Sequence, residues 1–361
     1  MNRARISGYV PELDGLRAFA AIAVVVFHAS GGTALPGGYM GVDIFFVLSA
    51  FLITALLDNE LRETGKIDLS GFYINRFLRL VPALLLMLTV YVSVAPWLWP
   101  NHNHLADAFL SAAYLSDYSY AYWHSPFYLR HTWSLAVEEH FYLIWPLILP
   151  VMIRTRRAVL IAFVLYVACF LWRADFDGGW LSYYYRFDTR ATGLLAGALL
   201  YFLIDRIPLS STSAYLAAGL IALLMVGVPI PRAAAAIPFA ELAAVVLIGS
   251  IVLGRAGVLA APLRSGPATW LGKRSYAIYL WHFPVAFFVR DKLPANLAIG
   301  FTLAVAVAAA AVSYVTVEAI GRHFKSAIAR RRGYGAPSDH ATAIWSAPII
   351  GQAPSQDSAQ A

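Results

Sequence analysis

Long apolar runs recur along almost the whole chain, and they limit its fold more than any other feature. Of the 361 residues, 60% are hydrophobic and only 13% are charged, whereas soluble domains carry about 25% charged residues. A helix needs about 20 mostly apolar residues to cross a bilayer. The sequence therefore predicts an all-α, polytopic integral membrane protein.

The apolar runs predict about ten transmembrane helices. The expected spans are residues 15–31, 42–58, 79–97, 133–152, 157–174, 187–204, 213–231, 236–254, 268–289 and 296–319. A shorter apolar segment near 105–116 is expected in a loop or at the membrane interface.

Basic residues are distributed unevenly between the expected connections. They gather in the chain start, in the second, fourth and eighth connections and after the last span, which places all of them on one side if ten helices alternate. Cytoplasmic loops collect Lys and Arg, so both termini are expected in the cytoplasm and the protein in the inner, cytoplasmic membrane. The formal charge of +7 follows from this rule, and no nucleic-acid partner is expected.

The composition changes near the end of the chain. We expect residues 1–325 to form the transmembrane domain and residues 326–361, rich in Ala, Ser, Pro and Gln, to be a disordered cytoplasmic tail. We find no soluble catalytic domain in the sequence. The only cysteine, Cys169, excludes an internal disulfide and a cysteine-based zinc site, and we expect no bound metal.

Several cations stand where helices begin on the cytoplasmic side. Ionisable groups inside a span cost about 2.5–3.5 kcal/mol by insertion scales and usually mark a pathway or a site. Arginine's planar fork suits phosphate, although ordinary anchoring at the cytoplasmic surface explains single cations equally well. The residues concerned are Arg17, Arg76, Arg79, Lys273 and Arg274.

A second polar set stands at the outer ends of the expected helices. These residues are His28, Asp43, Ser134, Glu138, Glu139, Arg186, Asp188 and His282, with His140 and Arg190 beside them. Side chains that reach to water at the interface are the competing explanation. That explanation suits Glu138 least, because a short carboxylate there lies about one turn inside a very apolar helix.

Arg17 and His28 are linked by their spacing in DGLRAFAAIAVVVFH. Eleven residues make just over three helical turns, so the two side chains share one face. They are separated by roughly 16 Å along the axis. One helix face therefore reaches from a cation inside to an imidazole outside, which suits a long ligand with an anionic head and a reactive end.

Six stretches in this order resemble the membrane-bound acyltransferase-3 family, the O-antigen acetylase type of O-acyltransferase. They are LDGLRAFAAIAVVVFH, GVDIFFVLSAFLIT, FYINRFLRLVP, HTWSLAVEEHFYLIWP, RFDTRATGLLAGAL and SYAIYLWHFP. The resemblance covers about residues 10–320 and implies a ten-helix fold with both termini inside. His140 departs from it, because the family usually has Gln there.

The resemblance implies transfer of an acyl group, most often acetyl, from cytoplasmic acyl-CoA to a hydroxyl of a carbohydrate such as an envelope or exported polysaccharide. It implies His28 as the catalytic histidine and Arg17 as its essential partner, and it points to Asp43, Arg76, Arg79 and Glu138 as site residues. Acyl-CoA enters as the donor substrate, and no bound cofactor is expected.

Ester formation needs a base for the acceptor hydroxyl, and histidine titrates near working pH. We expect Glu138, or alternatively Asp43, to hold the second ring nitrogen of His28. Arg17, Arg76, Arg79, Lys273 and Arg274 are assigned to the donor, and Ser134, Glu139, Asp188, Arg186 and His282 to the acceptor.

The sequence leaves several alternatives open. The acceptor is a macrolide or another small molecule in one of them, and in another the protein is a transporter for a lipid-linked sugar. Aromatic residues of the outer connection 98–132 either stack on sugars or form an interfacial belt. Direct transfer, an acyl-histidine intermediate, the acyl chain length and the oligomeric state are also undecided.

Overall fold

The computed structural model describes residues 9–175, 178–321 and 323–324, and all regular structure within them is helical. The predicted tail at 326–361 lies outside the described residues. The absence of any strand from the described residues confirms the all-α class.

Fifteen α-helices and four short 3-10 helices make up the described fold. The α-helices are α1 (Pro11–Ala29), α2 (Gly41–Thr64), α3 (Leu69–Leu98), α4 (His104–Ala112), α5 (Ser116–Trp123), α6 (Trp133–Arg154), α7 (Ala158–Ala174), α8 (Gly179–Tyr185), α9 (Phe187–Leu203), α10 (Ser211–Gly227), α11 (Ala233–Val252), α12 (Ala260–Leu263), α13 (Gly266–Lys273), α14 (Ser275–Val289) and α15 (Ala295–Val315). The 3-10 helices are η1 (Gly38–Met40), η2 (Arg130–Thr132), η3 (Ile230–Arg232) and η4 (Gly257–Leu259).

Each of the ten expected spans corresponds to a helix, with one correction. The span expected at 268–289 is divided at Arg274, where the backbone (φ −108°, ψ 4°) leaves helical geometry between α13 and α14. Helices α2, α3, α6, α11 and α15 are long and apolar enough to cross a membrane, and α7, α10 and α14 are shorter apolar helices.

Local chemistry sets several helix ends. Gly65 stops α2 in the left-handed conformation (φ 74°), where its N–H donates to the Leu61 carbonyl. The Asp68 carboxylate accepts from the Gly71 N–H at the start of α3, and Ser210 and Ser213 form a reciprocal capping box at α10. These caps satisfy backbone groups that a helix end leaves without a partner.

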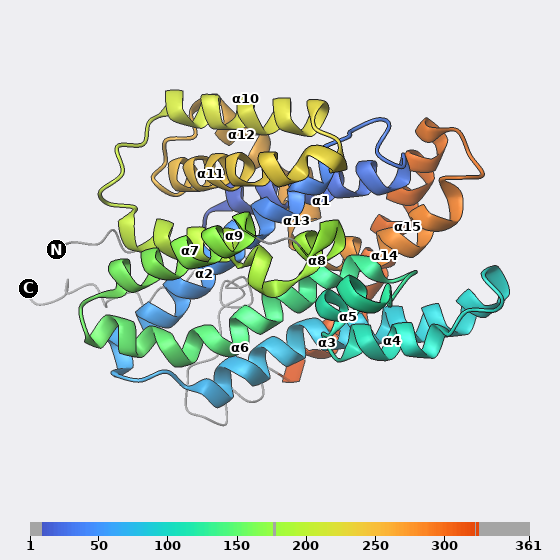
Figure 1. The fold of residues 1–361 in the computed structure, drawn as a ribbon, viewed down its shortest axis with the longest axis horizontal. Helices are drawn as coiled ribbons and strands as arrows, with labels where there is room; N and C mark the ends of the chain where they lie inside the picture. Colours follow the sequence, from blue (N-terminus) through green and yellow to red (C-terminus); the bar gives the residue numbers. More distant parts are fainter. Residues whose placement is uncertain (1–8, 176–177, 322, 325–361) are drawn as a thin grey trace, which may run out of the picture.

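Helices α1 and α2 run through the middle of the molecule, with α10 and α11 on one side and α3 and α6 on the other (Figure 1). In α2, 78% of the most apolar window is buried, against 33% in α3 and 22% in α15. The central helix is therefore enclosed by protein, while α3 and α15 present apolar faces to their surroundings.

Two ion pairs lie deep in the bundle. Arg190 of α9 and Asp43 of α2 are fully buried and 2.6 Å apart. Arg173 of α7 and Glu241 of α11 lie 3.0 Å apart and are also buried. A charge taken out of water needs a partner, so these contacts fix how α2, α7, α9 and α11 sit together. Arg190 does not reach to water at the interface.

Helix α1 packs closely against the segment that leads into α2. A Cβ atom added to Gly41 would collide with the Ala20 carbonyl oxygen and approach the Val24 side chain. A Cβ on Gly38 would approach the Ala23 carbonyl and Phe27 in the same way. Glycine at both positions therefore lets the two backbones meet.

Gly41→Ala should destabilise the bundle by roughly 1–3 kcal/mol, because the new methyl overpacks the contact between α1 and α2. Thermal unfolding in detergent micelles measures this as a lowered midpoint. Gly219→Ala in α10 is the matched control, since a Cβ there meets nothing within 4 Å and alanine favours helix. Equal midpoints for the two variants would contradict the close packing.

Candidate active site

Three adjoining cavities lie inside the bundle beside α1. We call them the inner, middle and outer cavities, with volumes of about 70, 50 and 190 Å³. The inner and middle cavities share Arg17, Ser49, Leu135, Glu138 and Tyr276 as walls. The middle and outer cavities meet at Val42 and Tyr279. Together they form a row with Arg17 at one end and His28 at the other.

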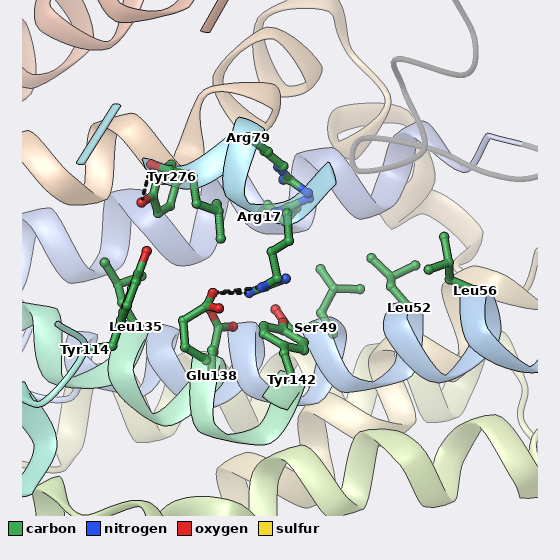
Figure 2. Close-up of a pocket in the computed structure, with 14 residues that line it drawn as sticks. Arg17, Ser49, Leu52, Leu56, Arg79, Tyr114, Leu135, Glu138, Tyr142 and Tyr276 are labelled. Atoms are coloured by element: carbon green, nitrogen blue, oxygen red, sulfur yellow. Dashed lines mark hydrogen bonds and ion pairs between the residues drawn. The ribbon is translucent and has the colours of Figure 1, made fainter. Parts of the chain in front are cut away.

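The inner cavity brings together three of the predicted arginines. Arg17 of α1 and both Arg76 and Arg79 of α3 line it. In Figure 2, Arg17 and Arg79 lie across the cavity from Glu138, Tyr142 and Ser49. The three guanidinium groups outnumber the carboxylates of Glu138 and Glu139, which line the same cavity. This cavity lies on the side that the charge pattern assigns to the cytoplasm.

Arg76 is held in place by contacts within the protein. Its guanidinium lies 2.6 Å from the Glu139 carboxylate and 3.3 Å from the centre of the Tyr142 ring. The spacing of α6 places Glu138, Glu139 and Tyr142 along this cavity. Glu139 therefore balances part of the positive charge, and the structure places it at the inner rather than the outer end.

The outer cavity contains His28, at the last turn of α1. Its walls also include His131, the aromatic rings of Tyr39, Trp133, Tyr184 and Tyr185, and the cations Arg130 and Arg290. Two buried polar atoms on these walls, Tyr39 Oη and His131 Nδ1, have no hydrogen-bond partner within the described part of the chain. A buried polar group without a partner is costly, so both are available to a ligand.

His28 is paired with a second histidine rather than with a carboxylate. His28 Nδ1 lies 3.0 Å from His282 Nε2, and His282 Nδ1 lies 2.5 Å from the Tyr279 carbonyl oxygen. Because a carbonyl can only accept, His282 carries its hydrogen on Nδ1 and offers Nε2 as the acceptor. In the neutral pair His28 therefore donates through Nδ1, and its Nε2 keeps a lone pair.

This geometry contradicts the prediction that Glu138 or Asp43 holds the second ring nitrogen of His28. Glu138 lines the inner and middle cavities, and Asp43 is paired with Arg190 and lines none of the three. His282, which we assigned to the acceptor, occupies the position expected for the carboxylate. The reason is that α14 passes closer to the end of α1 than the acidic residues of α2 and α6 do.

A group of hydrogen-bonded residues lies where the middle cavity meets the outer cavity. The Tyr279 hydroxyl donates to the His131 carbonyl at 2.9 Å and lies 2.7 Å from the Ser134 hydroxyl. Ser134 and Glu138 stand one turn apart on α6, and Tyr276 and Tyr279 stand one turn apart on α14. One face of each helix therefore forms the wall.

Because Arg17 and His28 share one helix face, the residues between them on α1 were expected to line the path of a long ligand. The structure shows that this part of α1 does not line the cavities. Residues 18–26 line none of the three, and Ala20, Ala23 and Val24 are buried in the hydrophobic core. The close approach of Gly38 and Gly41 occupies that part of α1. The walls of the connection come instead from α2, α6 and α14.

The comparison with known protein families settles the class of this arrangement. A family model for the acyltransferase domain of the acyltransferase-3 type matches residues 10–318. The chain belongs to the acyltransferase-3 family. It is a membrane protein in character, with several long apolar helices.

Two curated relatives of this acyltransferase are acetyltransferases by name. The peptidoglycan O-acetyltransferase OatA of Listeria monocytogenes is 33% identical over 311 residues, which cover 77% of this chain and 49% of the relative. The O-acetyltransferase OatA of Staphylococcus aureus is 31% identical over 321 residues, covering 78% and 51%. The chain thus spans about half the length of the relatives it matches. No solved structure matches significantly.

Four more predicted site residues, in addition to Asp43 and His282, do not line the cavities. Lys273 lies 5.0 Å from the Tyr9 ring, and Arg274 is placed over the Trp270 and Tyr314 rings. Arg186 and Asp188 pair with each other. The structure does not bring these four residues to the three cavities, whose linings include none of them.

Of the Phe, Trp and Tyr residues in the outer connection 98–132, only Tyr114 lines one of the three cavities. Trp97 and Trp123 are 86% and 74% exposed, and Trp99 stacks on Tyr128. The rings that line the outer cavity include Tyr39, Trp133, Tyr184 and Tyr185, none of which we singled out from the sequence. We also missed Arg130 and Arg290, although two cations on the side expected to be poor in Lys and Arg were a usable signal.

Removing Asp43 alone should destabilise the protein by about 3–5 kcal/mol, because Arg190 is then left buried without its counter-charge. Asp43→Leu combined with Arg190→Met removes both charges and should recover most of the loss. Thermal unfolding in detergent and acyl-transfer activity measure the two variants side by side. If the double variant is well folded but inactive, the catalytic assignment of Asp43 is correct and the purely structural one is wrong.

Proposed function

We propose that this chain is a membrane O-acyltransferase that moves an acyl group, in the first place acetyl, from cytoplasmic acyl-CoA to a hydroxyl of a carbohydrate. The acceptor class is an envelope or exported polysaccharide, and the protein works in the cytoplasmic membrane. The observation that carries the proposal is the row of adjoining cavities between the arginines of the inner end and His28 at the outer end. The names of the relatives support an acetyl group and a glycan acceptor.

The inner cavity suits the phosphate-bearing end of the donor. Arg17 and Arg79 supply guanidinium groups that form charge-assisted hydrogen bonds with phosphate oxygens. Arg76, tied to Glu139, fixes the wall between them. The long arm of the donor then extends through the middle cavity, past Val42 and Tyr279, and carries the thioester toward His28.

The outer cavity suits the transfer step. His28 Nε2 takes the proton of the acceptor hydroxyl while that oxygen attacks the thioester carbonyl. The C–O bond of the ester forms, the C–S bond breaks, and the proton on His28 passes to the departing CoA thiolate. The imidazolium that forms in between keeps its Nδ1–H directed at His282, whose orientation is fixed by the Tyr279 carbonyl.

His28→Ala should reduce acyl transfer by at least about 10²-fold, the scale of a lost general base, while expression and membrane insertion are unchanged. The assay follows release of free CoA thiol from acetyl-CoA in the presence of a glycan acceptor. A transporter of lipid-linked sugar releases no thiol, so a wild-type protein without thiol release overturns the proposal.

Three further variants refine this test. His124→Ala removes an exposed histidine of the outer connection and should leave the rate unchanged. His282→Gln keeps a side-chain acceptor for the His28 Nδ1–H and should retain more activity than His282→Phe, which keeps only the bulk of the ring. Equal activity of the two His282 variants would show that the hydrogen bond does not orient His28.

Arg17→Ala and Arg79→Ala should each weaken use of acetyl-CoA by about 10- to 100-fold, because one charge-assisted hydrogen bond contributes about 1.5–3 kcal/mol. Acetyl-pantetheine lacks the nucleotide phosphates, so its kcat/KM should change little in the same variants. Arg157→Ala, on an exposed cytoplasmic turn, serves as the control cation. If the two donors lose activity equally, the phosphate assignment is wrong.

A further inference from the structure

The outer cavity holds two arginines that the transfer step does not use. Arg130 belongs to η2, just before α6, and Arg290 follows the last residue of α14. Both line the same cavity as His28, and both side chains are only partly exposed. They come from segments 160 positions apart in the sequence, so the fold brings two distant cations together at the cavity that contains His28.

The two guanidinium groups are packed around one aromatic ring. The Arg130 guanidinium carbon lies 5.7 Å from the centre of the Phe287 ring, and that of Arg290 lies 4.3 Å from the same point. They are therefore no more than 10.0 Å apart, the sum of these two distances. Arg130 also lies 5.1 Å from the Phe283 ring. The aromatic contacts hold both charges at the cavity without neutralising them.

Little negative charge balances this pair. Within the described part of the chain, Arg130 has no ion-pair or hydrogen-bond partner, and the described residues that line the outer cavity include no carboxylate. Arg290 has Asp291 at 3.6 Å, but that side chain is 78% exposed, and exposed pairs are weak. The outer cavity is therefore positive beside His28, and a cavity lined by charges of one sign concentrates ligands of the other.

The position of the pair makes ordinary membrane anchoring a poor explanation. Lys and Arg accumulate on the cytoplasmic side of membrane proteins, whereas Arg130 and Arg290 share a cavity with His28 at the opposite end from the inner arginines. Two like charges that converge on a partly enclosed space repel each other, and an anion placed between them relieves that repulsion.

We propose that Arg130 and Arg290 bind an anionic group of the acceptor, a carboxylate or a phosphate, and thereby place its hydroxyl at His28 Nε2. This inference rests on the proposed acyl transfer, and it adds that the acceptor substrate carries a negative charge. Tyr39, Tyr184 and Tyr185 supply aromatic and hydroxyl surface for the sugar ring, and the two arginines select among sugars by charge.

The experiment uses the full chain in nanodiscs of phosphatidylcholine, with acetyl-CoA as donor. One acceptor pair is N-acetylmuramic acid and its lactyl amide, which differ by a carboxylate. The other is N-acetylglucosamine 1-phosphate and N-acetylglucosamine, which differ by a phosphate. Thiol release gives kcat/KM, and microscale thermophoresis gives binding of each sugar without donor.

The wild type should prefer the charged member of at least one pair by about tenfold, the effect of one charge-assisted hydrogen bond. Arg130→Gln and Arg290→Gln should each remove most of that preference while changing kcat/KM for the neutral sugar less than about threefold. Arg130→Lys keeps the charge and should restore part of the preference. The pair that responds identifies carboxylate or phosphate as the recognised group.

Lys292→Gln is the matched control, because its ammonium lies 3.4 Å from the Phe288 ring and does not line the outer cavity. Equal losses on charged and neutral sugars in the Arg130 and Arg290 variants overturn the inference, as does a wild type without preference. A loss that appears only in nanodiscs of anionic phosphatidylglycerol assigns the pair to lipid headgroups instead. Charge-selective binding without any thiol release would refute the proposed acyl transfer but leave the anion site in place.

Discussion

An ionisable side chain inside an apolar bundle must have a partner, and that constraint separates the buried charged residues in the described part of this chain into two sets. Asp43 with Arg190 and Arg173 with Glu241 neutralise each other's charge within the bundle, so their role is to hold helices together, although each of the four side chains keeps at least one buried polar atom without a hydrogen-bond partner among the described residues. The residues around the three cavities are satisfied only in part. Both sets therefore keep unused hydrogen-bonding capacity, but only the second set lines the cavities, where a substrate would complete its hydrogen bonds. The distinction between the two sets follows from this difference in position.

His28 shows how the same constraint acts on a neutral side chain. The Tyr279 carbonyl sets the hydrogen position of His282, and His282 sets that of His28. No carboxylate is needed for this orientation, and a carboxylate beside His28 would oppose the positive charge that Arg130 and Arg290 bring to the outer cavity. A histidine partner orients His28 while leaving the cavity positive.

The helices could be predicted from the sequence because apolar length is a local property. All ten expected spans correspond to helices, and the break at Arg274 was missed because a change of backbone angle at one residue leaves no trace in hydropathy. Arg17, Arg76 and Arg79 were predicted as a group from their place on the expected cytoplasmic side, and all three line the inner cavity. The expected helix start was wrong for Arg76 and Arg79, because α3 begins at Leu69. Side-chain partners were not predictable, because His28 meets His282 across 254 positions and Asp43 meets Arg190 across 147. Asp43 resembled a catalytic acid from its place at a helix start, and only the packing of α9 against α2 reveals its partner.

The shared wall of the middle and outer cavities has a consequence for the membrane itself. Val42 and Tyr279 line both of these internal spaces, and the Tyr279 hydroxyl is held by the His131 carbonyl and Ser134. A rotamer change at Tyr279 that breaks these hydrogen bonds would therefore alter both cavities at once. A passage opened in this way would need movement of side chains and not the rocking of helix repeats that many transporters use. A thin acyl-bearing arm that fills the opening as it passes would also seal it against ions.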